Sequence, residues 1–85
     1  MNMLYNSLNF CVLEFSDFGD AALHPAGGFE IMDKSMRREI FLGGPQAERF
    51  KHDVDELMST EPTPDEFDAF LSGYAGLMTQ PLAMH

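Results

Sequence analysis

The segment 27–44 constrains the fold most, because a glycine pair stands at each of its ends, Gly27-Gly28 and Gly43-Gly44. Between the pairs, two short runs that mix apolar and polar residues flank the polar stretch 34–37. Runs of this kind on either side of a polar turn are typical of a β-hairpin. We therefore predict an antiparallel hairpin over residues 28–43, in which the glycines supply positive φ angles or tight backbone at the strand ends.

The register of this hairpin follows from the side chains that would meet across it. The favoured register pairs Asp33 with Arg38, Ile31 with Ile40, and Phe29 with Leu42. It places four apolar residues on one face and an ion pair beside the turn, whereas a slip of two residues sets Glu30 against Glu39. It also leaves a four-residue loop, which is a common hairpin length.

One further strand is predicted before the hairpin. Residues 8–15 are rich in aromatic and β-compatible side chains and are apolar on both faces, which indicates a central strand. Residues 16–27 carry turn residues and show no periodicity, so we expect a loop there.

Two helices are predicted after the hairpin. Apolar residues recur at spacings of three and four over residues 45–59 and 64–79. Pro45 suits the first turn of the first helix, and Thr63 with Glu66 forms a capping box for the second. Pro81 ends the second helix, and residues 81–85 form a short apolar tail.

These elements predict an α+β fold in one domain, 1–85: a three-stranded antiparallel sheet followed by a two-helix hairpin on one face. We assume that Cys11, Leu13 and Phe15 face the helices. The outer face then presents four apolar side chains, Phe10, Val12, Met32 and Phe41. Such a face is too apolar to stand bare in water, and no third helix is predicted to cover it.

The charge of the chain limits its partners. Five basic against fourteen acidic residues give a net charge of −9, and eight of the acids lie within residues 45–71. Because phosphate and anionic lipid are bound through Lys and Arg, we expect neither nucleic acid nor membrane as a direct ligand. A basic protein partner remains compatible with this surface, although an acidic helical face is more often simply solvated.

No catalytic, cofactor or metal site is predicted. Cys11 lies in an apolar run and is expected to be a buried small hydrophobe. Glu48 and His52 are four residues apart and would form an exposed helical pair, while His24 and His85 lie elsewhere. Neither glycine pair has phosphate-loop spacing. We therefore expect a protein that is not an enzyme and needs no cofactor.

We expect no signal peptide, because the first residues contain no basic region and no long apolar core, and no apolar run reaches the roughly 20 residues that span a bilayer. With a single cysteine, no internal disulfide is possible. We expect a cytoplasmic protein.

Three blocks carry a resemblance to a known family: the opening 1–7, the core 28–34 with 37–41, and the ending at 77–78, 80–81 and 85. Together they resemble a domain-of-unknown-function family of short cytoplasmic proteins of betaproteobacteria. The likeness covers nearly the full length. It implies a bacterial source and a small stand-alone protein, and it transfers no catalytic residue.

The favoured function is a non-enzymatic interaction or regulatory module that acts as a homodimer. Its expected interface is the outer sheet face, the turn and the tail: Phe10, Val12, Met32, Phe41, Arg37, Leu82 and Met84. One alternative is an acidic regulator, antitoxin-like or nucleic-acid-mimicking, that binds a basic protein surface. A metal- or small-ligand-binding enzyme is the least favoured hypothesis.

Overall fold

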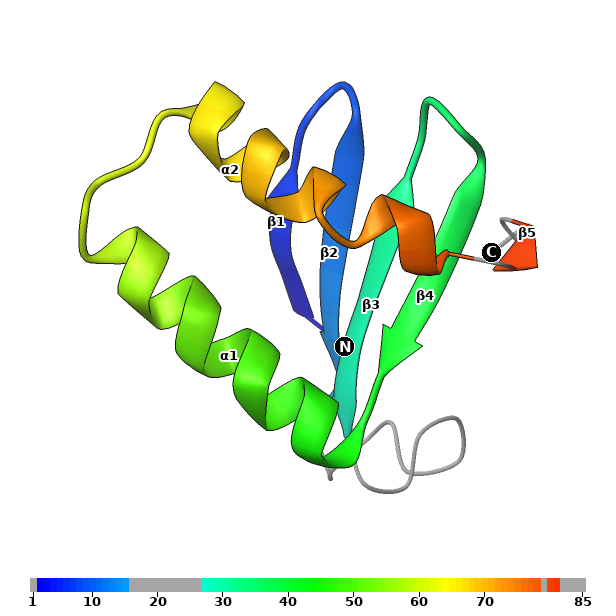
Figure 1. Cartoon of the computed structure of the whole chain (residues 1–85), viewed down its shortest axis with the longest axis horizontal. Helices are drawn as coiled ribbons and strands as arrows, with labels where there is room; N and C mark the ends of the chain where they lie inside the picture. Colours follow the sequence, from blue (N-terminus) through cyan, green and yellow to red (C-terminus); the bar gives the residue numbers. More distant parts are fainter. Residues whose placement is uncertain (1, 16–26, 79, 82–85) are drawn as a thin grey trace.

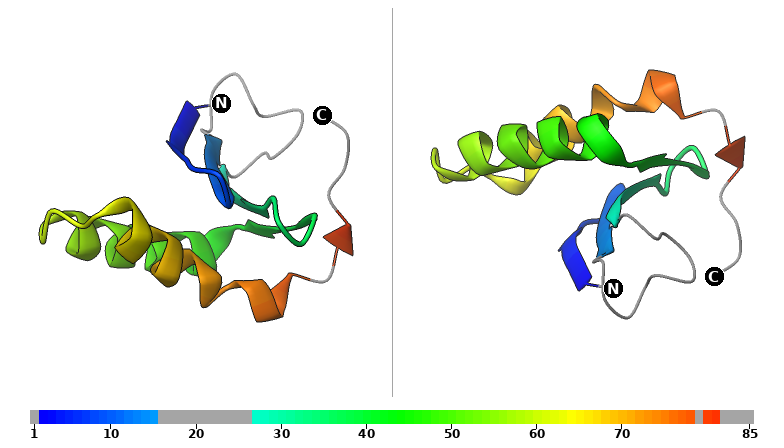
Figure 2. Two further views of the ribbon diagram at one scale, coloured as in Figure 1. Left: turned by 90° about the horizontal axis from the view of Figure 1, so that it is seen from above. Right: turned by 90° about the horizontal axis from the view of Figure 1, so that it is seen from below.

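The structure is a computed structural model that describes residues 2–15, 27–78 and 80–81. Its elements are β1 (Asn2–Asn6), β2 (Phe10–Phe15), β3 (Gly28–Asp33), β4 (Arg38–Leu42), α1 (Gly44–Met58), α2 (Pro64–Ser72), the 3-10 helix η1 (Ala75–Leu77) and β5 (Gln80–Pro81). The strands form one antiparallel sheet in the order β1-β2-β3-β4-β5, and both helices lie on one face of it (Figure 1, Figure 2). The fold is α+β, as predicted.

The sheet has four full strands, so the prediction of three is wrong. The additional strand is β1, which pairs with β2 and carries a bulge where the register shifts between Met3 and Tyr5. Asparagine is depleted in strands, and Asn2 and Asn6 bound this one, so its sequence gives only a weak strand signal. At the opposite edge, the two residues of β5 pair with β4. The predicted loop 16–27 and tail 81–85 fall largely outside the described residues.

The predicted register of the β3–β4 hairpin is confirmed at all three pairs. The predicted ion pair between Asp33 and Arg38 is wrong, although the two residues do lie opposite each other. Asp33 is buried, and its carboxylate accepts hydrogen bonds from the Ser35 hydroxyl at 2.7 Å and from the Met36 backbone N–H at 3.1 Å. A buried carboxylate needs hydrogen-bond donors, and the turn that directly follows Asp33 provides them. Asp33 therefore stabilises this turn.

The predicted orientation of β2 is also wrong. In the observed register Val12 lies opposite Ile31, and residues directly opposite each other share a face, so Phe10 and Val12 point toward the helices. Cys11, Leu13 and Phe15 point to the outer face instead. Because β2 is apolar on both faces, its sequence pattern cannot distinguish these two orientations.

Glycine at position 28 accounts for the observed orientation. Phe15 lies opposite Gly28, and the rings of Phe15 and Phe41 meet edge to face on the outer side at a centroid distance of 6.2 Å. A β-carbon on Gly28 would stand 2.7 Å from the Phe41 ring and 2.3 Å from the Leu42 carbonyl oxygen. Gly28 thus leaves the space in which the two rings from neighbouring strands come together.

The core fills the space between the inner face of the sheet and the helices. Its fully buried members come from every layer: Val12, Ile31, Phe50, Leu71 and Met78 are each at most 1% exposed. Phe50 is the one buried residue of α1, and its ring lies 5.1 Å from that of Phe29 and 5.4 Å from that of Tyr74. The helix therefore attaches to the sheet through its N-terminal half.

Both helices begin close to where the sequence predicts. α1 starts one residue early with a proline in its first turn, and α2 opens with the predicted capping box between Thr63 and Glu66. The end of the second helix was predicted seven residues too late, because α2 stops at Ser72. Gly73 and Gly76 lower the helix propensity of the next turn, and the backbone continues with 3-10 hydrogen bonds such as Tyr74 N–H to Leu71 O at 2.9 Å.

We expect Gly28→Ala to destabilise the protein by about 2 kcal/mol or more, because its φ of 145° and the overlap with Leu42 both exclude a side chain. Thermal unfolding followed by circular dichroism should show a melting temperature lower by roughly 10 °C. Gly76→Ala is the control, since its β-carbon would enter open space. Equal melting temperatures for the two variants would contradict this role of Gly28.

Candidate interaction site

The predicted interface residues do not form one surface. Phe10 and Val12 are buried in the core at 6% and 1% exposure, so they cannot contribute to an outer face. Met32 and Phe41 do lie on that face, but both are half-buried. Leu82 and Met84 lie outside the described residues.

Most of the outer face is not open to solvent either. Cys11, Phe15 and Glu30 all point to that side and are at most 7% exposed. Burial raises the pKa of the Cys11 thiol, with Glu30 adding to the effect and Lys34 opposing it. A thiol that is buried and held protonated is a poor nucleophile, which agrees with the structural role predicted for Cys11.

Arg37 is exposed at the tip of the β3–β4 hairpin with a φ of 53°. Only glycine and asparagine adopt this left-handed conformation readily. The neighbouring Met36 is 60% exposed, so the tip presents one cation and one apolar side chain.

The unpredicted strand β1 and the turn after it carry three exposed apolar side chains. Met3, Leu4 and Leu8 are 57%, 45% and 94% exposed, and we call these three residues the N-terminal patch. They lie on β1 and on the turn between β1 and β2, at the sheet edge opposite β5. The apolar run Met3-Leu4-Tyr5 is the only sequence signal that could have indicated this surface.

Asp68 of α2 holds this edge of the sheet in place. Its carboxylate accepts hydrogen bonds from the Tyr5 hydroxyl at 2.7 Å, the Ser7 hydroxyl at 2.9 Å and the Asn9 amide at 3.2 Å. The pKa of Asp68 is lowered overall: burial acts to raise it, but the three hydrogen bonds to the charged form outweigh burial. Tyr5 also stacks on Phe67 with ring centroids 4.3 Å apart.

Lys34 fixes the turn between β1 and β2 from the other side. Its ammonium group donates to the Asn6 side-chain oxygen and to the Ser7 carbonyl, the latter at 2.7 Å. Its backbone N–H donates to the Asn9 carbonyl at 2.8 Å. The exposed Leu8 is therefore presented by a turn that is held on both sides.

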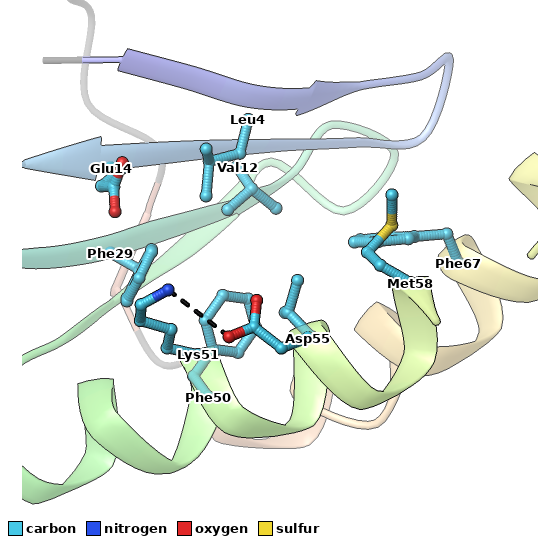
Figure 3. Close-up of a pocket in the computed structure, with 10 residues that line it drawn as sticks. Leu4, Val12, Glu14, Phe29, Phe50, Lys51, Asp55, Met58 and Phe67 are labelled. Atoms are coloured by element: carbon cyan, nitrogen blue, oxygen red, sulfur yellow. Dashed lines mark hydrogen bonds and ion pairs between the residues drawn. The ribbon is translucent and has the colours of Figure 1, made fainter. Parts of the chain in front are cut away.

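A cleft of about 280 Å³ opens between this edge of the sheet and α1 (Figure 3). It is lined by Leu4, Val12, Glu14, Phe29, Phe50, Lys51, Val54, Asp55, Met58 and Phe67. The cleft exists because α1 diverges from the sheet beyond Phe50, and its C-terminal end projects past β1 (Figure 1, Figure 2). A smaller hollow of about 160 Å³ adjoins it near Pro62 and Pro64.

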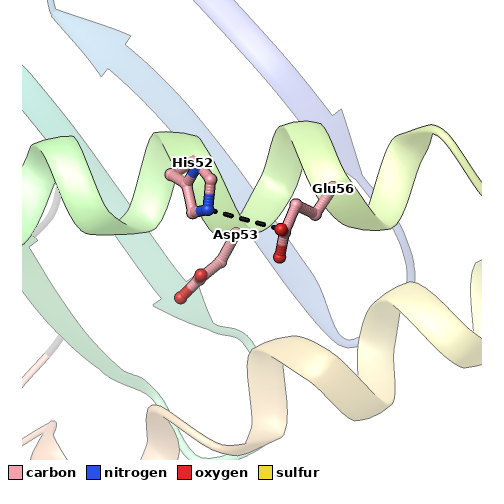
Figure 4. Close-up of side chains that lie close together, drawn as sticks. All are labelled: His52, Asp53 and Glu56. Atoms are coloured by element: carbon pink, nitrogen blue, oxygen red, sulfur yellow. Dashed lines mark ion pairs between the residues drawn. The ribbon is translucent and has the colours of Figure 1, made fainter.

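The predicted pair between Glu48 and His52 is wrong. His52 instead lies 3.4 Å from Glu56, one turn further along α1, and Asp53 is close to both (Figure 4). Their side chains come from a single helix, and those of His52 and Glu56 are about 70% exposed. No fourth ligand from the described residues joins this group, so it falls short of the closed set that a structural zinc site needs.

The fold and this site define a small acidic α+β protein with an apolar patch and a cleft at one sheet edge. It belongs to the family described as "Protein of unknown function (DUF3567)", whose model matches residues 1–85. It is similar to Protein BTH_I0359 of Burkholderia thailandensis, with 46% identity over 85 residues that cover 100% of both chains. No solved structure matches the chain significantly. The resemblance found in the sequence is confirmed.

Neither helix of the described chain combines the length and the apolar character that crossing a bilayer requires.

We expect Asp68→Asn to lower the stability at pH 7 by about 1 kcal/mol, an effect kept small by solvent screening. Because the folded-state pKa of Asp68 is lowered, its stabilisation is complete above the unfolded-state pKa of about 3.9. It is lost as the pH falls through the folded-state value.

Urea unfolding at several pH values tests this expectation. The stability difference between wild type and Asp68→Asn should close as the solution is acidified below about pH 3.9. Tyr5→Phe removes one of the three hydrogen bonds without removing charge and should couple to Asp68→Asn in a double-mutant cycle. If the difference in unfolding free energy between wild type and Asp68→Asn stayed the same at the lowest pH measured, the role assigned to Asp68 would be ruled out.

Proposed function

We propose that this protein is a small non-enzymatic interaction module that acts as a cytoplasmic homodimer through its N-terminal patch. The observation that carries the proposal is the gathering of exposed apolar side chains at one edge. Of the six large apolar residues that are exposed in the described chain, three lie within residues 3–8. Apolar side chains that gather on a surface mark contact sites more reliably than scattered ones.

The charge distribution supports the same surface. Residues 1–13 contain no Asp, Glu, Lys or Arg, although the whole chain carries a net charge of −9. Two copies that met through the acidic segment 45–71 would bring like charges together. Contact through the N-terminal segment adds no charged side chain of its own to such an interface.

This proposal moves the interface away from the outer sheet face expected from sequence. Met32, Phe41 and Arg37 remain secondary candidates, since the first two are half-buried and the third lies at the hairpin tip. The non-enzymatic part of the proposal is supported by the burial of Cys11 and by the exposure of the His52 group.

A second candidate function is the binding of a basic protein. The exposed acids of α1 and α2 favour it, since Glu48, Asp55, Glu56 and Asp65 all face solvent. Electrostatic attraction would speed such an encounter and would weaken as salt is added. Under either candidate function we propose no direct contact with nucleic acid or membrane, because the acidic surface repels phosphate.

We expect Leu8→Glu to convert the dimer into a monomer, because it places a charge at the most exposed apolar position of the patch. Light scattering after size-exclusion chromatography, with the protein at tens of micromolar, measures the change. Its circular dichroism spectrum should remain that of wild type, since Leu8 is not part of the core.

Met36→Glu is the matched control, because Met36 is also exposed but lies at the hairpin tip. It should leave the dimer intact. A wild-type protein that is already monomeric, or a dimer that survives Leu8→Glu, would refute dimerisation through the patch.

A further inference from the structure

Glu14 occupies an unusual position for a carboxylate. On β2 it follows Phe10 and Val12 on the inner face, and it lies opposite the buried Phe29. An apolar residue would be expected at this point of the alternation. The Glu14 side chain is half-buried, and among the described residues its carboxylate makes no hydrogen bond or ion pair.

The Glu14 side chain points from β2 toward α1 at the cleft (Figure 3). The cleft holds two other charged groups, and these already pair with each other, with the Lys51 ammonium 3.4 Å from the Asp55 carboxylate. The net charge of the three groups is −1, and Glu14 is the one that has no counter-ion among the residues that the structure describes. The remaining lining is apolar and includes the exposed Leu4 and Met58 at the mouth.

The size of the cleft limits what can occupy it. Pockets for small molecules and cofactors span roughly 300–1,000 Å³, and this cleft of about 280 Å³ falls just below that range. A space of this size accommodates a single long side chain. The chemistry calls for an alkyl stem that packs on the apolar lining and a cationic end that reaches the carboxylate, which is the structure of lysine.

We propose that the cleft receives a lysine side chain of a basic partner protein, with Glu14 as its counter-ion. This inference rests on the proposed function as an interaction module, and it names the chemistry of a partner other than a second copy. The net charge of −9 attracts such a partner. Lys51 opposes binding of a cation, because its ammonium is the one positive charge among the described residues that line the cleft.

The test is a titration of isotope-labelled full-length protein, followed by NMR, with three capped pentapeptides. They have the form Ala-Val-X-Val-Ala, with lysine, norleucine or glutamate at the central position. We expect the lysine peptide to shift the amide resonances of Leu4, Glu14 and Val54. The norleucine peptide, which keeps the four side-chain carbons of lysine but lacks the ammonium, should bind at least about fivefold more weakly, and the glutamate peptide should not bind.

Variants of the cleft residues test whether the charges of Glu14 and Lys51 determine the affinity for the lysine peptide. Glu14→Gln keeps the shape of the side chain and should weaken the lysine peptide about fivefold, whereas Lys51→Gln should strengthen it about twofold. Glu48→Gln makes the same charge change outside the cleft. It should alter the affinity for the lysine peptide only through the net charge of the protein.

Equal binding of the lysine and norleucine peptides would overturn the inference and would point to an apolar occupant, such as Leu8 of a second copy. Binding that is unaffected by Glu14→Gln, or no shift at millimolar peptide, would overturn it as well. Light scattering on the same samples separates this failure from failure of the proposed function. If the protein is a dimer whose cleft does not bind the lysine peptide, only the lysine site is refuted. If it is a monomer whose cleft does not bind the peptide, both the lysine site and the proposed function are refuted.

Discussion

The packing of Phe50 against the sheet is the central contact of α1, and the position of this helix depends on it. Phe50 is the single buried residue of α1, and its ring packs against Phe29 of β3 and against Phe70 and Tyr74 after it in the chain. The C-terminal half of α1 packs against the core only through the partly buried Val54 and Leu57, and it diverges from the sheet (Figure 1). The cleft beside Glu14 lies where the helix and the sheet separate.

The edge strand β1 depends on polar contacts more than on burial. Its only core contribution is Tyr5, which stacks on Phe67, and the turn that follows is held by hydrogen bonds to Asp68 and Lys34. An uncharged apolar edge that is held in this way presents Leu8 to solvent at a fixed place. Sheet edges of this kind are ordinarily protected, and at the opposite edge two residues of β4 pair with β5. The bulge at β1 discourages simple strand addition, so its side chains are the features left for recognition.

Much of the fold could be predicted from local signals, and the failures have physical causes. The hairpin register followed from the pairing of Ile31 with Ile40, and the capping box marked the start of α2. The orientation of β2 was not predictable, because both of its faces are apolar and Gly28 decides between them through the rings of neighbouring strands. The candidate site was missed for a related reason. Strand β1 and the cleft arise from contacts between residues some sixty positions apart, such as Tyr5 with Asp68, which no periodicity reveals.

The central claim is that an uncharged apolar patch holds two acidic chains together, and sedimentation equilibrium of the wild-type protein at two salt concentrations tests it most directly. Two copies of net charge −9 repel each other, and salt screens this repulsion while leaving apolar contact intact. The dimer fraction should therefore rise between about 0.05 M and 0.5 M salt, as the Debye length falls from over 10 Å to a few ångströms. A protein that is monomeric at both concentrations, or a dimer that dissociates as salt is added, would contradict the account.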